Sequence, residues 1–380
     1  MINISTPAEG DDFFDREEDI KHIKELLQNG NNVLLLSPRK FGKSSILRRI
    51  SLESSEIIYI DLQTVRTFEG FFSYWLYYAG TKGIIKKITE KFSDIKEVLE
   101  RIEKFSISVE GASVELLPRI KNWQDWTDRL VKELDKIENV VIIFDEFPDM
   151  IENFIDNYTK KEVRDFLRWF SGITEKYPKI CYIICGSVCL DFVVRELKFP
   201  RAFMNFKRYE LEMMSSEKAA ELFEKKLVEA GLKPTAEATK RMLDIVDPIP
   251  WFILLLAYDI YSNRAHLSEQ RVKKGDIDRA YRNILGYREF NYYLHRLEKY
   301  SREHYDVGKK LLYELSKDEC LSSEELWGPY QYVTDGGNED SFFHLLADLE
   351  NDFYIKYDEE RGGYRFYSKV LRDWWGKLFR

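Results

Sequence analysis

The stretch Val33-Leu34-Leu35-Leu36-Ser37-Pro38-Arg39-Lys40-Phe41-Gly42-Lys43-Ser44-Ser45 decides how the first half of the chain folds. The apolar run at 33–36 predicts a short buried strand, and a helical pattern begins at Ser44. A strand, a Gly-Lys-Ser turn and a helix in this order are typical of a phosphate-binding loop, in which backbone N–H groups surround an anion. Ser37 stands where the usual pattern has its first glycine.

We therefore expect Lys43 to reach the β- and γ-phosphates of a nucleotide, and Ser44 to bind Mg²⁺. The rest of the loop would line the same ligand, which adds Ser37, Pro38, Arg39, Lys40, Phe41, Gly42 and Ser45. A Gly-Lys-Ser triplet alone is weak evidence, so the surrounding pattern matters.

A second pattern supports the first. Val140–Phe144 predicts another buried strand, and it ends in the carboxylates Asp145 and Glu146. In phosphoryl-transfer sites of this kind, such an Asp holds Mg²⁺ and the following Glu polarises the attacking water. The alternative is that the two acids merely cap the next helix. Both patterns in this order predict a site for ATP or ADP with Mg²⁺.

Further strand-like runs at 57–60, 180–185 and 206–211 alternate with helical segments. This alternation predicts an α/β fold with a parallel sheet between two helical layers. We assign residues 1–212 to this core, with an edge insertion at about 64–122 that contains a hairpin turned at Glu110-Gly111. Residues 213–300 read as a helical lid. Residues 301–380 read as three helices and two strands, the order of a winged helix.

Composition narrows the class of protein. The chain has 380 residues, 44% of them hydrophobic, and a net charge of −8, which argues against nonspecific nucleic-acid binding by the whole chain. The longest apolar run, at 251–258, is far shorter than the ~20 residues that span a bilayer. The first ten residues show no signal-peptide pattern. We expect a cytoplasmic protein that does not enter a membrane.

With these motifs the chain resembles the archaeal-type ATPases of the AAA+/STAND group of P-loop NTPases, over nearly its whole length. Phe13-Phe14-Asp15-Arg16-Glu17-Glu18-Asp19 is similar to the family's box near the adenine and ribose, with Asp15 replacing a Gly and Asp19 a Glu. The resemblance implies that Arg16 lies close to the nucleotide. The alternative is an ordinary helix start with Asp15 as N-cap.

The resemblance also implies roles for residues outside the main motifs. Ser187, after the strand at 180–185, matches a polar position that senses the γ-phosphate. Pro250, in Pro248-Ile249-Pro250, matches the lid proline that packs on the base, or else marks a plain helix start. Arg201 is the first choice for an arginine near the γ-phosphate, with Arg195 and Arg208 as alternatives.

Three functions follow from this sequence. The first is an AAA+/STAND-type ATPase that switches a separate protein partner and assembles with itself when nucleotide is bound. The second is a DNA-acting ATPase linked to mobile elements or defence, and the third is a nucleotide-binding scaffold without useful hydrolysis. DNA binding through the winged helix is not favoured, because residues 340–352 contain no Lys or Arg. The better DNA candidate is a basic stretch of the lid: Arg271, Lys273, Lys274, Arg279 and Arg282.

Overall fold

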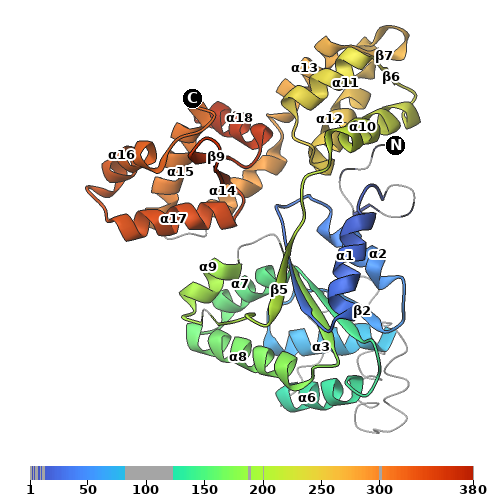
Figure 1. Cartoon of the computed structure of the whole chain (residues 1–380), viewed down its shortest axis with the longest axis vertical. Coiled ribbons are helices and arrows are strands. Elements are labelled where there is room, and N and C mark those ends of the chain that lie inside the picture. Colours follow the sequence, from blue (N-terminus) through green and yellow to red (C-terminus); the bar gives the residue numbers. More distant parts are fainter. Residues whose placement is uncertain are drawn as a thin grey trace. The chain divides into compact units, whose positions relative to one another are not determined.

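A computed structural model of the chain describes Ile2, Ile4, Pro7, Ala8, Gly10 and residues 13–81, 123–186, 190–199, 201–298 and 302–379. Ser187 and the hairpin expected around Glu110-Gly111 lie outside these residues. Backbone contacts divide the chain into two compact units (Figure 1). The sheet unit contains Pro7–Ser37 and Gly42–Leu211, and the C-terminal unit contains Met1–Thr6, Pro38–Phe41 and Glu212–Arg380.

The sheet unit is built on five parallel strands in the order β2-β3-β4-β1-β5. Their bounds are β1 Asn32–Leu36, β2 Ile57–Asp61, β3 Val141–Asp145, β4 Cys181–Gly186 and β5 Phe206–Glu210. Strands β3 and β4 are buried along their whole length, as central strands of a parallel sheet should be. The parallel α/β core expected from the alternating pattern is confirmed.

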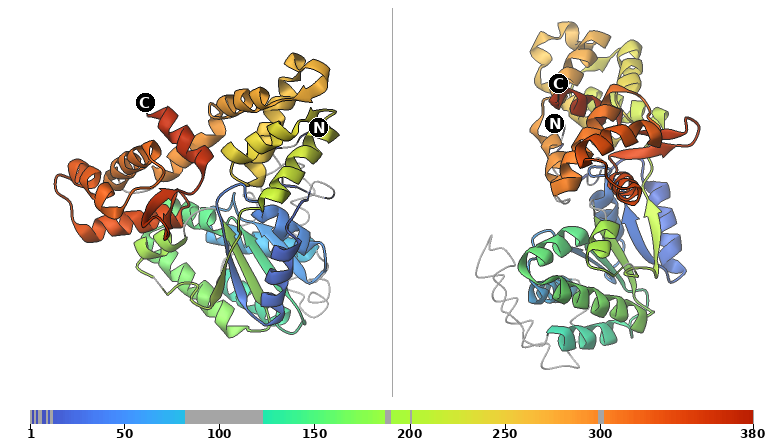
Figure 2. Two further views of the ribbon diagram at one scale, coloured as in Figure 1. Left: turned by 45° about the horizontal axis from the view of Figure 1, so that its top comes forward. Right: turned by 90° about the vertical axis from the view of Figure 1, so that its left-hand side faces the viewer.

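Helices cover both faces of this sheet (Figure 2). On one face lie α1 (Glu17–Gln28) and α2 (Lys43–Ser51), which contact β1 and β2 respectively. The other face carries a large apolar core in which Ile58, Phe144 and Ile184 meet the remaining helices. These helices are α3 (Phe68–Thr81), α6 (Trp123–Leu134), α7 (Phe147–Asn157), α8 (Lys160–Lys176) and α9 (Leu190–Glu196). Residues of one strand alternate between the two faces, so each face has its own core.

The first part of the C-terminal unit is helical, as the sequence predicts. Its elements are α10 (Ser216–Glu229), β6 (Lys233–Pro234), α11 (Ala236–Ile245), α12 (Pro250–Ser262), β7 (Arg271–Val272), α13 (Lys274–Ile284) and α14 (Asn291–Leu297). Ser215 caps α10, because its hydroxyl accepts a hydrogen bond from the Lys218 backbone N–H. The most apolar of these helices is α12, with most of its residues buried.

The second part follows the expected order of three helices and a hairpin, and one more helix comes after it. The elements are α15 (Arg302–Lys317), α16 (Ser323–Thr334), α17 (Glu339–Asn351), β8 (Ile355–Asp358), β9 (Gly363–Phe366) and α18 (Lys369–Leu378). The sequence predicts that α16 ends at Trp327, but the helix runs on past Pro329. Buried Tyr330 explains the difference, because its ring packs on Trp327 and Phe342 and fixes this turn.

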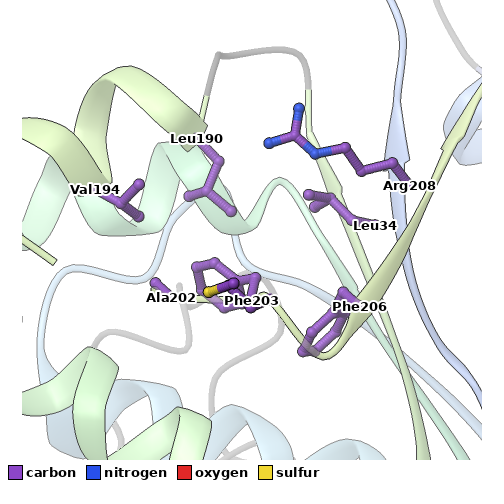
Figure 3. A pocket seen from close by; sticks show the side chains of 8 residues that line it. Leu34, Leu190, Val194, Ala202, Phe203, Phe206 and Arg208 are labelled. Carbon is purple, nitrogen blue, oxygen red and sulfur yellow. The ribbon is translucent and has the colours of Figure 1, made fainter. Parts of the chain in front are cut away.

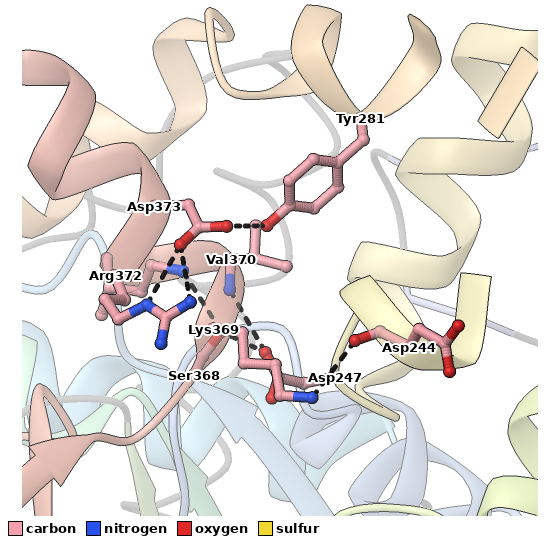
Figure 4. Close-up of polar contacts among 9 residues, drawn as sticks. Asp244, Asp247, Tyr281, Ser368, Lys369, Val370, Arg372 and Asp373 are labelled. Atoms are coloured by element: carbon pink, nitrogen blue, oxygen red, sulfur yellow. Dashed lines mark hydrogen bonds and ion pairs between the residues drawn. The ribbon is translucent and has the colours of Figure 1, made fainter. Parts of the chain in front are cut away.

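Polar contacts join the two parts of this unit (Figure 4). One carboxylate oxygen of Asp247 accepts hydrogen bonds from the Ser368 hydroxyl at 2.8 Å and the Val370 backbone N–H at 3.3 Å. Tyr281 donates to the carboxylate of Asp373 at 2.8 Å. Asp247 before α12 and Tyr281 of α13 therefore hold the first part of this unit against α18.

A buried ion pair adds to these contacts. Arg296 of α14 pairs with Asp352, the residue that ends α17, and each side chain is only 2% exposed. A buried charge pair of this kind is costly to break on one side, since the remaining charge would be left without compensation.

Candidate functional site

The carboxyl ends of the strands bring the sequence motifs to one edge of the sheet. Strand β4 lies between β1 and β3, with Leu36 of β1 beside Gly186 of β4. The loop after β1 and the acids after β3 therefore flank the end of β4. On the next strand, Asp61 of β2 is the register partner of Asp145. Ligands of open α/β sheets bind outside the carboxyl ends of strands, so this edge is the candidate site.

Two residues of the phosphate-binding loop have the left-handed backbone that is typical of anion nests. Gly42 is the N-cap of α2 with φ 95°, and Lys40 has φ 71°. Left-handed residues at alternate positions turn successive N–H groups toward one point, and this makes a concavity that binds anions. A Cβ added to Gly42 would meet nothing within 4 Å, so its positive φ rather than crowding requires glycine there.

Lys43 is buried and folds back over its own loop. Its Nζ donates a hydrogen bond of 2.6 Å to the backbone oxygen of Ser37, which is also buried. Ser44 is half-buried at the start of α2. Ser45 is turned elsewhere, because its hydroxyl accepts a hydrogen bond of 2.9 Å from the Ala8 backbone N–H. The Lys43 ammonium is thus held close to the backbone of its own loop.

Asp145 is buried and held by two donors. One carboxylate oxygen accepts a hydrogen bond of 2.6 Å from the Tyr59 hydroxyl, and the other accepts one of 3.1 Å from the Glu146 backbone N–H. Tyr59 belongs to β2, so the neighbouring strand fixes the orientation of this carboxylate. Burial, followed by the charge of Asp145, raises the pKa of Tyr59. Tyr59 therefore stays a neutral donor.

A buried thiol marks where the motifs meet. Cys185 of β4 is fully buried, and burial is the main reason that its pKa is raised well above the ordinary value. Asp145 and Glu146 raise this pKa further, whereas Lys43 lowers it. Lys43, Asp145 and Glu146 therefore act electrostatically on one point of the sheet. Cys185 itself stays a neutral thiol and packs as a small apolar residue.

Two ionisable residues near Asp145, the acid Asp61 and the base Arg48, were not predicted from the sequence. Burial raises the pKa of Asp61, and Asp145 adds to the effect, while Arg48 opposes it. The Arg48 guanidinium carbon lies 5.7 Å from the centre of the Tyr59 ring. The alternation of β2 could have indicated that Tyr59 and Asp61 share one face, but not that this face contacts Asp145.

Glu146 adopts an unusual backbone conformation. It is the N-cap of α7 with φ 53° and ψ 36°, in the left-handed region that favours glycine. Its side chain makes no capping hydrogen bond, contrary to the alternative that the two acids serve as a helix cap.

Gly186 at the end of β4 packs against the start of α7, because a Cβ there would lie 2.3 Å from Cδ of Pro148. The sheet thus has a close contact with the first turn of α7.

Arg16 is buried next to the start of α1. Its guanidinium forms an ion pair of 3.0 Å with Asp19, and Asp19 also accepts a hydrogen bond of 2.6 Å from the Tyr209 hydroxyl of β5. The N-cap of α1 is Arg16 itself, so the alternative of Asp15 as N-cap is wrong. The acid three residues after Arg16 therefore has a structural role: Asp19 anchors this box to the edge strand β5.

All three candidate arginines are exposed, and two of them lie on the segment between β4 and β5. Arg195 is on α9, and Arg201 is in the turn before β5. Arg208 is on β5 and lines a cavity of about 240 Å³ (Figure 3). The rest of this lining is mainly apolar: Leu34, Leu190, Val194, Ala202, Phe203, Met204 and Phe206. The selection of Arg201 as the residue near the γ-phosphate stays a prediction.

Pro250 is the first residue of α12, in the C-terminal unit. This is the helix position that proline occupies most readily, because its missing N–H would have no partner there. The next residue, Trp251, receives Lys40 of the phosphate-binding loop, whose Nζ lies 5.6 Å from the ring centre. Sequence reasoning missed this contact, and no local pattern indicates it. The predicted role of Pro250 at the base stays a prediction.

Comparison with known protein families identifies a matching family. A family described as an ATPase domain predominantly from Archaea matches residues 13–254. This range contains the box at 13–19, the phosphate-binding loop, Asp145 with Glu146, and Pro250. The chain belongs to this archaeal ATPase family. A comparison with curated protein sequences finds no match.

One solved structure agrees with this assignment at the level of the fold, and two others are more distantly similar. A Walker-type ATPase of Pyrococcus abyssi aligns with a TM-score of 0.68 at 19% identity, over 98% of this chain and 99% of the other. An ORC2 protein of Aeropyrum pernix in its ADP form has a TM-score of 0.49 at 11% identity, over 97% of each chain. The RuvB branch-migration motor of Thermotoga maritima has a TM-score of 0.42 at 11% identity, over 94% and 93%.

The geometry of this archaeal-type ATPase suits a nucleotide with Mg²⁺. The nest at Lys40 and Gly42 offers backbone donors to phosphate, with Lys43 as the nearby cation. Asp145 offers a hard oxygen ligand held in one orientation by Tyr59 and by the Glu146 N–H, as Mg²⁺ requires.

In the parts of the chain that the structure describes, no helix combines the length and apolar character needed to cross a bilayer.

Proposed function

We propose that this ATPase is a nucleotide-dependent switch that binds ATP with Mg²⁺, hydrolyses it, and acts on a separate protein partner. The observation that carries the proposal is the meeting of two motifs within the sheet unit. Lys43 follows β1 and the fixed carboxylate of Asp145 ends β3, and these two strands flank β4. A cation for phosphate and an oxygen ligand for Mg²⁺ therefore lie at one edge of the sheet, as a nucleotide site requires.

In the proposed site, each residue type has a definite task. The N–H groups of the nest and the start of α2 bind the phosphates, and Lys43 neutralises their charge. Ser44 and Asp145 hold Mg²⁺, which would neutralise charge on the phosphate oxygens. Glu146 accepts a proton from the attacking water. Catalysis then comes from positioning and charge stabilisation, with no covalent intermediate on the protein.

The left-handed backbone of Glu146 supports this assignment. Strained residues persist where the surrounding structure holds them, and they cluster at functional sites. At φ 53° a glycine would suit the turn better, so a glutamate there is consistent with a need for its carboxylate. This feature also speaks against the scaffold without hydrolysis, since a protein that only binds nucleotide needs no such acid.

The experiment compares the wild-type chain with Lys43→Ala. We expect the wild type to bind ADP and ATP in calorimetric titrations with Mg²⁺, and to release phosphate from ATP. Loss of the Lys43 charge should weaken binding by about 10- to 150-fold, since hydrogen bonds to charged groups contribute ~1.5–3 kcal/mol. Equal affinity in both proteins would show that the loop does not bind phosphate. Pull-downs with trapped ATP and without nucleotide then test for a partner and for self-association.

The acidic character of α17 argues against DNA recognition by the proposed winged helix. From Asp340 to Asp352 the chain has no basic residue except His344, and its acids Asp340 and Glu350 reach the surface, whereas Asp348 and Asp352 are buried. An acidic helix would repel the phosphates that it must approach in the groove. Within the lid, Arg279 already pairs with Asp276 at 3.4 Å. Tight, strongly salt-dependent binding of duplex DNA by the full chain would favour the DNA-acting function instead.

A further inference from the structure

Three residues of the phosphate-binding loop contact aromatic rings of the C-terminal unit. The Arg39 guanidinium carbon lies 4.1 Å from the centre of the Tyr292 ring, and Lys40 approaches Trp251. The Phe41 ring centre lies 6.0 Å from that of Tyr367, and Phe41 is only 1% exposed. We call Trp251, Tyr292 and Tyr367 the aromatic clamp. All six residues group within the same unit.

The backbone of the loop needs such support. Lys40 has φ 71°, in the left-handed region that costs free energy for every residue except glycine. This conformation belongs to the anion nest, so the loop relies on an unfavourable backbone geometry to bind phosphate. The loop's own sequence has no glycine at this position. Contacts from outside the loop must therefore stabilise it.

The clamp provides contacts of the right kind. Cations over aromatic faces are stabilised, and more strongly when water is excluded. Lys40 as a whole residue is exposed, but local burial is the main cause of its lowered pKa, the Arg39 charge lowers this pKa further, and Glu289 opposes both. The loop is thus held on three successive residues, Arg39, Lys40 and Phe41.

We propose that Trp251, Tyr292 and Tyr367 are positioning residues that hold the phosphate-binding loop in its anion-binding conformation. The inference rests on the proposed function of this loop. Because coupling between two equilibria is reciprocal, bound nucleotide strengthens the clamp by the same factor by which the clamp strengthens nucleotide binding.

A double-mutant cycle on Arg39 and Tyr292 tests the clamp. Tyr292→Leu keeps an apolar side chain of helix-forming type but removes the ring, and Arg39→Gln removes the cation. We expect each change to weaken ADP–Mg²⁺ binding by roughly 2- to 5-fold in calorimetry, as for one cation–π contact. The double variant should be no weaker than either single variant, because both remove the same interaction. Tyr292→Phe should restore binding.

Two further measurements separate positioning from a general loss of structure. The KM for ATP should rise in Tyr292→Leu while kcat stays close to that of the wild type. In a Lys40→Gly background, the effect of Tyr292→Leu should shrink, because glycine adopts positive φ without support. Tyr332→Leu is the matched control, since Tyr332 is 85% exposed on α16, and it should bind ADP as the wild type does.

The outcomes distinguish the two proposals. If the wild type binds no ADP, the proposed function fails and the clamp with it. If the wild type binds ADP and Lys43→Ala does not, the proposed function holds. In that case, wild-type affinity in Tyr292→Leu, or additive effects in the cycle, would overturn the clamp alone. Should Tyr292→Leu fail to fold, Arg39→Gln decides the matter, because wild-type affinity in that variant has the same meaning.

Discussion

Two helices begin at the candidate site, and both begin at a residue with a left-handed backbone. Helix α2 starts after Gly42, at φ 95°, and helix α7 starts after Glu146, at φ 53°. Glycine adopts this conformation freely, whereas glutamate does so at a cost of about 1–2 kcal/mol. The difference indicates what each position supplies: backbone N–H groups at the start of α2, and a side chain at the start of α7.

The most severe test of this contrast is Glu146→Gln, which keeps the size of the side chain and removes its basicity. We expect ATP hydrolysis to fall by about 10²–10⁴-fold, the usual contribution of a general base. Binding of ATP should stay close to that of the wild type, because the phosphate-binding loop is unchanged. Single-turnover phosphate release measures the first quantity and calorimetry the second. Wild-type turnover would exclude Glu146 as the base.

A substitution at the end of β4 should disturb α7 while leaving α2 in place. In Gly186→Ala the new Cβ would lie 2.3 Å from Cδ and 2.6 Å from Cγ of Pro148, so the first turn of α7 must shift. Overpacking of this kind typically costs ~1–3 kcal/mol of stability. We expect a lower midpoint in denaturant unfolding and a lower kcat, with ADP affinity retained.

Pro148→Ala provides the matched rescue, because it removes the ring atoms that meet the new Cβ. The double variant Gly186→Ala with Pro148→Ala should recover most of the lost stability. If the double variant is as unstable as Gly186→Ala alone, the contact with Pro148 is not the cause.

Reciprocal substitutions at the two helix starts compare the backbones directly. Gly42→Ala should lower the free energy of unfolding by about 1–2 kcal/mol, because alanine must adopt a positive φ. Glu146→Gly should leave stability equal or raise it by up to about 1 kcal/mol, because relief of the left-handed strain is partly offset by the greater freedom of the unfolded chain. Urea unfolding of the nucleotide-free proteins measures both. Effects of the same sign would contradict the comparison.

The smallest expected effect concerns Asp61, which lies beside Asp145 on the neighbouring strand. Burial raises the pKa of Asp61, so the folded state binds its proton more tightly than the unfolded state. This contribution is complete below the unfolded pKa of about 3.9, and it is lost as pH rises through the folded value. Relative to Asp61→Asn, the wild type should therefore lose stability with rising pH. Thermal unfolding in Mg²⁺-free buffer checks the sign, and a difference that is constant across pH would contradict it.

The features that depend only on residues close together in the sequence could be predicted from it. The loop at 37–45 and the strand that ends at Asp145-Glu146 carry their patterns within a few positions, so the motifs and the parallel sheet were predictable. The Tyr59 hydroxyl on Asp145 was not, because it depends on the register between β2 and β3, which no local pattern specifies. The contact of Gly186 with Pro148 likewise joins residues far apart in the chain.

The backbone conformation of the phosphate-binding loop could not be predicted for the same reason. Lys40 is an ordinary loop residue in the sequence, and its positive φ goes with contacts to side chains far along the chain. The end of α16 shows a related effect, since Pro329 predicts a helix break and the packing of Tyr330 overrides it. Local propensity is a weak guide wherever tertiary contacts are strong.

The buried pair of Arg296 and Asp352 has a consequence for the way this protein can change over evolutionary time. Loss of one partner alone would leave an isolated charge in the interior, at a typical cost of ~3–5 kcal/mol, whereas joint replacement by apolar residues is often neutral or better. Lineages should therefore rarely pass through the single substitutions. Among relatives we expect the two positions to covary, with both charges retained or both exchanged together.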